Sequence, residues 1–98
     1  MTYADFIETI NTAAGVALTT AKRKVAFRAH TAENIAFFTP ASTNKPRRVS
    51  PKYVHEYLRV FNETQSLEPV NYPKNLFDKA YALAIIQRWL RQQQGLPN

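Results

Sequence analysis

Apolar residues near the N-terminus recur at the spacing of a helix. The i, i+3, i+4, i+7 positions of one helical face are occupied by Tyr3, Phe6, Ile7 and Ile10. Thr2 and Asp5 stand at the spacing of a capping box, and Gly15 can end the segment. We therefore expect a short amphipathic helix over residues 3–13.

After Gly15 the pattern changes to short runs of β-branched and aromatic residues, which favours strands. The three runs are Val16–Thr20, Val25–His30 and Ile35–Thr39. Their connectors are short enough for antiparallel hairpins. In the second run apolar residues alternate with Arg28 and His30, which predicts a meander with one buried and one polar face.

Pro40 ends the third strand, because proline cannot donate a ladder hydrogen bond. The following residues 41–49 offer turn formers and bases but little to bury, so we expect an exposed loop. Ser50 and Pro51 form an N-cap and first helical position, which predicts a helix over residues 51–63. Its apolar face comprises Val54, Tyr57, Leu58 and Phe61.

Residues 65–74 contain two prolines and predict an irregular crossover. Asn75 can cap a third helix that runs through Phe77 to about Gln93, followed by a frayed tail over residues 94–98. The pattern as a whole predicts a single α+β domain over residues 1–98. It has an N-terminal helix, a three-stranded antiparallel meander and two C-terminal helices.

Composition narrows the class of protein. A chain of 98 residues with 45% hydrophobic content suits one globular core. The absence of cysteine removes disulfides and thiolate chemistry, and no apolar run is long enough to span a bilayer. The first ten residues lack a signal-peptide pattern, so we expect a cytoplasmic protein with no membrane partner, and the Met1 start counts against an internal fragment.

The net charge of +6 is concentrated in the middle of the chain. Residues 1–21 contain two acidic side chains and no Lys or Arg. Nine of the 13 bases lie between Lys22 and Arg59, where the only acidic residues are Glu33 and Glu56. This distribution is typical of a localised contact with a polyanion.

Two basic clusters carry this excess. Lys22, Arg23 and Lys24 occupy the turn between the first two expected strands, where they can reach a phosphate backbone or simply keep the hairpin soluble. The second cluster leads into the helix at Ser50, whose N-terminal amides can also favour an anion. Residues 42–48 of this cluster supply hydroxyls, an amide, a lysine and two arginines. Such groups contact phosphates and base edges.

Exposed aromatic side chains beside these bases would favour single-stranded nucleic acid through stacking. Phe38 or Phe37 fits the buried face of the third strand, which leaves Tyr53 and Tyr72 as the candidates for exposed rings.

The sequence gives little support for a catalytic site or a metal site. His30 and His55 have no partner at metal-ligand spacing, and neither a phosphate-cradling glycine loop nor a nucleophile elbow is present. The acidic residues are few and scattered. We expect no enzyme activity, no metal and no cofactor.

The sequence therefore predicts a nucleic-acid-binding module, with duplex DNA favoured over RNA. The connector between the last two helices is too long for a helix-turn-helix, so the basic turn and loop would contact the phosphate backbone. The candidate binding residues are Lys22, Arg23, Lys24, Arg28, Asn44, Lys45, Arg47, Arg48, Ser50 and Lys52. Asn44 with Arg47 or Arg48 are the expected base readers.

A second hypothesis comes from a different class of function. A small inhibitor or accessory subunit could use the same cations on an acidic protein surface. A third is that the chain is a targeting domain of a larger enzyme.

Overall fold

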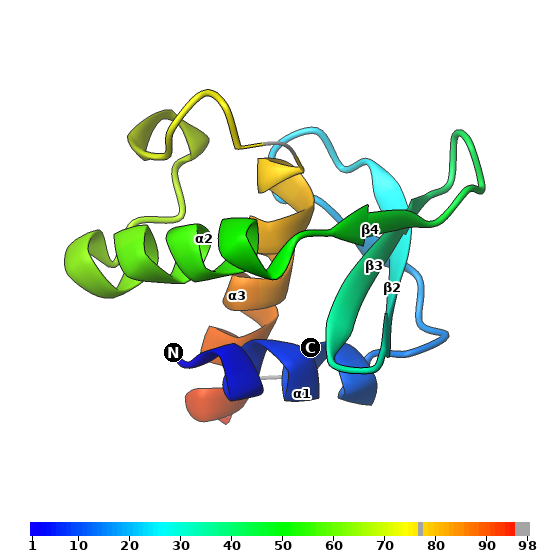
Figure 1. Cartoon of the computed structure of the whole chain (residues 1–98), viewed down its shortest axis with the longest axis horizontal. Helices are drawn as coiled ribbons and strands as arrows, with labels where there is room; N and C mark the ends of the chain where they lie inside the picture. Colours follow the sequence, from blue (N-terminus) through cyan, green and yellow to red (C-terminus); the bar gives the residue numbers. More distant parts are fainter. Residues whose placement is uncertain (77, 96–98) are drawn as a thin grey trace.

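The computed structural model describes residues 1–76 and 78–95. In chain order its elements are α1 (Tyr3–Thr12), β1 (Leu18–Thr19), β2 (Ala26–Ala32), β3 (Ile35–Pro40), β4 (Arg47–Val49), α2 (Pro51–Thr64), a 3-10 turn η1 (Pro69–Asn71) and α3 (Lys79–Gln93). This confirms the α+β class. Figure 1 shows the sheet on the right of the view, with α2 and α3 beside it and α1 below. Phe77 of the expected third helix and residues 96–98 of the expected tail lie outside the described residues.

The sheet has four antiparallel strands in the order β1-β2-β3-β4, so the expected count of three strands was wrong. The additional strand β4 lies within the segment expected to be an exposed loop. Its Val49 pairs with Ala36 of β3 and is only 2% exposed, because it completes the apolar face of the sheet. A strand of three residues that begins with two arginines shows no apolar alternation in the sequence.

The apolar core lies between the sheet and the helices. The Phe27 and Phe38 rings of β2 and β3 meet edge to face, with centroids 5.8 Å apart, and Tyr81 of α3 contacts both. Helix α1 contributes Phe6 and Ile10, each 0% exposed. The helices therefore cover one face of the sheet. The opposite face of β2 stays exposed, as the strict alternation of its burial shows.

The first two helices follow the sequence pattern closely. The capping box of α1 is complete, since the Asp5 backbone N–H donates to Thr2 Oγ1 at 3.0 Å and the Thr2 N–H donates to Asp5 Oδ2 at 2.9 Å. Helix α2 begins at Pro51 with Ser50 as its N-cap, although the Ser50 side chain makes no capping hydrogen bond.

Two other boundaries differ from the expectation. Helix α3 begins at Lys79 rather than near Asn75, because its N-cap Asp78 adopts a left-handed conformation with φ of 64° that interrupts helical geometry. Strand β1 is limited to Leu18 and Thr19, and Val16 before it is 42% exposed. Beyond β1 the Thr20 hydroxyl accepts from the Val25 N–H at 3.0 Å and closes the turn into β2.

Candidate nucleic-acid interface

The face of the sheet opposite the core is the strongest candidate for an interface. Strand register and alternation define this outer sheet face as Thr19, Ala26, Arg28, His30, Ala32, Ile35, Phe37, Thr39 and Arg48. None of these nine residues is acidic, and all four contributed by β2 are exposed. The outer sheet face therefore carries two arginines and no acidic side chain.

An aromatic pair occupies the middle of the outer sheet face. His30 of β2 lies opposite Phe37 of β3, with ring centroids 4.9 Å apart and planes only 6° from parallel. Arg48 of β4 is the neighbour of Phe37 on the other side, and Arg28 is two residues before His30 on the same strand. Stacked rings with cations nearby suit an unpaired nucleobase and its phosphates.

The Arg48 end of the outer sheet face borders α1 and α2. The Tyr3 hydroxyl donates to the Asn34 carbonyl at 2.6 Å, and the Tyr3 ring lies 4.8 Å from the His55 ring. Burial raises the pKa of Tyr3, while the positive charge of Arg48 lowers it. Tyr3 and His55 thus form a second ring pair, which the Tyr3 hydroxyl ties to the β2–β3 turn at Asn34.

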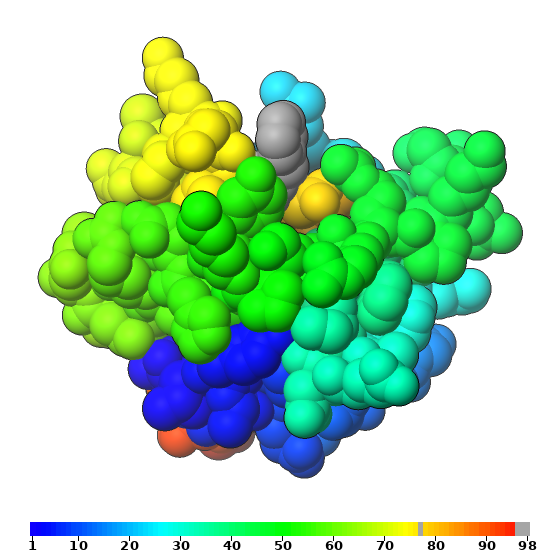
Figure 2. All heavy atoms as spheres, in the orientation of Figure 1, coloured from blue at the N-terminus to red at the C-terminus, as the bar shows by residue number. Residues whose placement is uncertain are grey.

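The meander brings the two basic turns to the same end of the sheet. In an antiparallel sheet ordered β1-β2-β3-β4, the β1–β2 and β3–β4 turns lie at the same end of the strands. Both turns are at the top of Figure 1. Lys24 and Asn44 each have φ of 54° in these turns. Figure 2 shows the β3–β4 turn, which carries Lys45, projecting beyond the body of the molecule. The two basic turns therefore lie at the same end of the sheet, although they are about twenty residues apart in the sequence.

Three of the expected cations face a groove instead. Lys22, Arg23 and Arg47 line a space of about 960 Å³ next to the crossover and the start of α3. Lys22 Nζ lies 2.5 Å from Glu68 Oε2, and Arg47 Nη2 lies 3.0 Å from Asp78 Oδ1. The two carboxylates offset much of the positive charge in the groove.

The remaining expected residues divide by exposure. Ser50 is half-buried at the start of α2, whereas Asn44 is exposed. Within the part of the chain that the structure describes, six of the expected cations are exposed and have no ion-pair partner. These unpaired cations are Arg23, Lys24, Arg28, Lys45, Arg48 and Lys52.

The aromatic candidates from the sequence lie elsewhere than expected. Tyr72 is 3% exposed, its hydroxyl donates to the Ser66 carbonyl at 2.8 Å, and burial raises its pKa to about 12. Tyr53 is half-buried and packs against the core. Phe37 and His30 supply the outer rings. A signal was present, because adjacent Phe37 and Phe38 in one strand must point to opposite faces.

Within residues 1–76 and 78–95, no three His, Cys, Asp or Glu side chains gather closely enough to hold a metal ion. None of the described helices combines the length and apolar character needed to cross a membrane. Comparisons of the chain with protein-family models, with curated proteins and with solved structures found no match.

Proposed function

We propose that this chain is a non-catalytic module that binds nucleic acid across the outer sheet face and the two turns at its end. One observation carries the proposal: the His30 and Phe37 rings stack on a face without acidic residues, with Arg48 beside Phe37 and Arg28 two residues along the strand from His30. Such a surface combines base stacking with phosphate neutralisation.

The preferred partner in this proposal is a single strand. The sequence alone favoured duplex DNA, since backbone contacts need no unpaired base. The aromatic pair adds a reason for a single strand, because bases can stack on exposed rings only when they are unpaired. A duplex would contact the unpaired cations but leave the His30 and Phe37 pair unused.

Salt dependence tests the electrostatic part of the proposal. If the four unpaired cations of the outer sheet face and its turns neutralise phosphates of a single strand, log K should fall with log salt at a slope of about −3, from roughly 0.7 per phosphate. These four cations are Lys24, Arg28, Lys45 and Arg48. Fluorescence anisotropy with a labelled single strand at rising salt measures this slope. An affinity that does not change with salt would contradict the proposal.

A matched pair of variants tests the location. Arg48→Gln should weaken binding and reduce the size of the salt slope by about 0.7, because one phosphate contact is lost. Arg59→Gln removes the same charge from α2, where Arg59 is paired with Glu56 and Glu63, and should leave the slope unchanged. Equal effects of the two variants would indicate a response to net charge rather than a site.

The preference for a single strand over a duplex is tested with the same fluorescent label. A duplex of identical sequence should bind more weakly than the single strand. If no nucleic acid binds at low salt, while an acidic protein recovered from nuclease-treated extract does bind, the chain is an accessory protein and the nucleic-acid proposal fails.

A further inference from the structure

His30 is the residue of the outer sheet face whose charge can change near neutral pH. A histidine side chain gains or loses its proton in the range of about pH 5 to 8, whereas Arg28 and Arg48 on the same face keep their charges. The remaining residues of the face have no side chain that ionises in this range. The number of positive charges on this surface therefore depends on the protonation of one imidazole.

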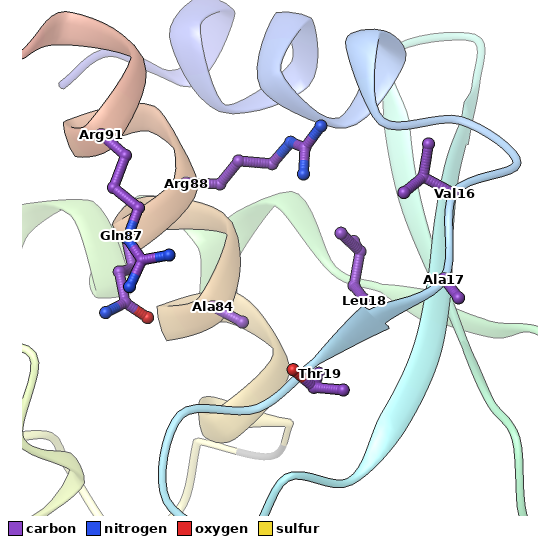
Figure 3. Close-up of a pocket in the computed structure, with 8 residues that line it drawn as sticks. All are labelled: Val16, Ala17, Leu18, Thr19, Ala84, Gln87, Arg88 and Arg91. Atoms are coloured by element: carbon purple, nitrogen blue, oxygen red, sulfur yellow. The ribbon is translucent and has the colours of Figure 1, made fainter. Parts of the chain in front are cut away.

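The space between β1 and α3 offers no such group. This cavity of about 230 Å³ is lined by Arg88 and Arg91 of α3, and the described residues around it include no histidine and no carboxylate (Figure 3). Arginine stays charged in folded proteins. A response of binding to pH near neutrality would therefore point to the outer sheet face rather than to this cavity.

The surroundings of His30 are cationic before a ligand binds. Its ring is exposed and stacks on the Phe37 ring, with centroids 4.9 Å apart and planes 6° from parallel. The charged side chains of the face are Arg28 on β2 and Arg48 on β4, while β1 and β3 contain no charged residue. In the free protein these two arginines oppose a third positive charge at His30.

The elements next to this end of the sheet supply no ion pair to His30. Tyr3 of α1 donates to the Asn34 carbonyl in the β2–β3 turn, and burial raises its pKa, so its hydroxyl stays neutral. The Tyr3 ring contacts His55 of α2, an exposed residue outside the outer sheet face. Glu33 is exposed in the same turn, and neither it nor His30 forms an ion pair among the described residues. Nothing in the described chain therefore holds a proton on His30.

A bound strand would reverse this balance. Phosphates that contact Arg28 and Arg48 neutralise their charges and bring negative charge next to the imidazole, which favours its protonated form. The face of the Phe37 ring also attracts a cation. Both nitrogens of a protonated imidazole are donors, so His30 can then add a third phosphate contact to those of the two arginines.

We propose, on the basis of the proposed function, that His30 is a protonation-dependent phosphate contact, so that the outer sheet face binds a single strand more tightly when this imidazole is charged. The coupling is reciprocal. Binding of the strand must strengthen proton binding at His30 by the same factor by which the proton strengthens binding of the strand.

Anisotropy with labelled oligothymidylate tests the coupling, because thymine neither gains nor loses a proton in this range and the label is one whose emission does not change with pH. Affinity should fall about fivefold or more between about pH 5.5 and 8. The size of the salt slope should also fall by about 0.7, since one phosphate contact is lost. Equal affinities at both pH values would overturn this inference and leave the proposed function intact, whereas no binding at any pH would overturn both.

A matched pair of variants locates the proton. His30→Phe keeps a ring that can stack but cannot be charged, so the affinity of this variant should no longer depend on pH. His55→Phe removes the other histidine of the chain, which is exposed on α2, and should keep the dependence of the wild type. A pH dependence that persists in His30→Phe, or that disappears in His55→Phe, would overturn the role of His30.

NMR on the wild-type chain gives a second measurement that needs no variant. The titration midpoint of the His30 ring protons should move upward by about one pH unit when oligothymidylate saturates the protein, and that of His55 should move less. An unchanged midpoint at His30 would overturn the inference. Equal movements at the two histidines would do so too, because they would indicate a general response to the charge of the strand rather than a contact.

Discussion

At the residue scale, the orientation of Phe37 decides whether the outer sheet face can stack a base. Phe37→Ala should lower the affinity for a single strand by about fivefold or more, since base–aromatic stacking contributes roughly 1–3 kcal/mol. The salt slope should stay unchanged, because no charge is lost. Anisotropy at several salt concentrations separates the two effects.

Phe37→Leu is the companion to this variant, because it keeps apolar volume and removes only the ring. It should lose most of the same affinity while the circular dichroism spectrum stays that of the wild type. Wild-type affinity in Phe37→Leu would show that hydrophobic contact, rather than stacking, operates at this position.

Asp78 links stability to pH at a single residue. Burial raises its pKa above 3.8, and the charge of Arg47 only partly opposes this. The unfolded chain therefore releases this proton first, so Asp78 destabilises the fold increasingly as pH rises from 3.8 through the raised pKa. Asp78→Asn removes the charge and still tolerates the left-handed backbone. Its Tm should rise by roughly 2–5 °C at neutral pH.

Thermal unfolding in acid provides the check on this explanation. Well below pH 3.8 Asp78 is protonated in both the folded and the unfolded chain, so it is neutral like Asn. The difference in Tm between the wild type and Asp78→Asn should then vanish. Glu68→Gln is the control, because the Lys22–Glu68 pair is more than half exposed and should contribute little. A lower Tm for Asp78→Asn at neutral pH would show that the ion pair with Arg47 outweighs the cost of burial.

At the scale of elements, the α1 capping box makes a stability prediction. Thr2→Ala removes the side-chain acceptor for the Asp5 N–H and should cost about 1 kcal/mol of unfolding free energy. Thr12→Ala is the matched control at the other end of α1, where the hydroxyl donates to the Thr9 carbonyl and caps no free N–H. Urea titrations of both variants should show a smaller loss for Thr12→Ala; equal losses would contradict the capping role of Thr2.

The elements differ in how far the sequence could predict them. Helices α1 and α2 were predictable because an apolar face at helical spacing and an N-terminal signal agreed in each. Strand β4 was not, because only Val49 of its three residues is buried and its pairing with β3 depends on a contact across the turn. The start of α3 was misplaced because a left-handed Asp78 leaves no distinctive local pattern.

At the scale of the whole molecule, the candidate site depends on topology more than on any segment. The sequence identified Arg28 and Arg48 as candidate binding residues, but their placement beside His30 and Phe37 requires the register of three strands. The same register explains why Arg47 faces Asp78 while its neighbour Arg48 faces outward. Charge could be predicted from the sequence, and alternation placed Arg28 on the polar face of its strand, whereas the face on which Arg48 lies could not be predicted.

Chemical-shift mapping with a single-stranded oligonucleotide tests most directly whether the outer sheet face binds nucleic acid. The proposal predicts that the largest changes occur at Arg28, His30, Phe37 and Arg48, with smaller ones in the turns at residues 21–24 and 41–46. Residues 56–64 of α2 should stay unchanged. No saturable change at the outer sheet face, or changes confined to α2 and the crossover at residues 65–76, would contradict the proposal.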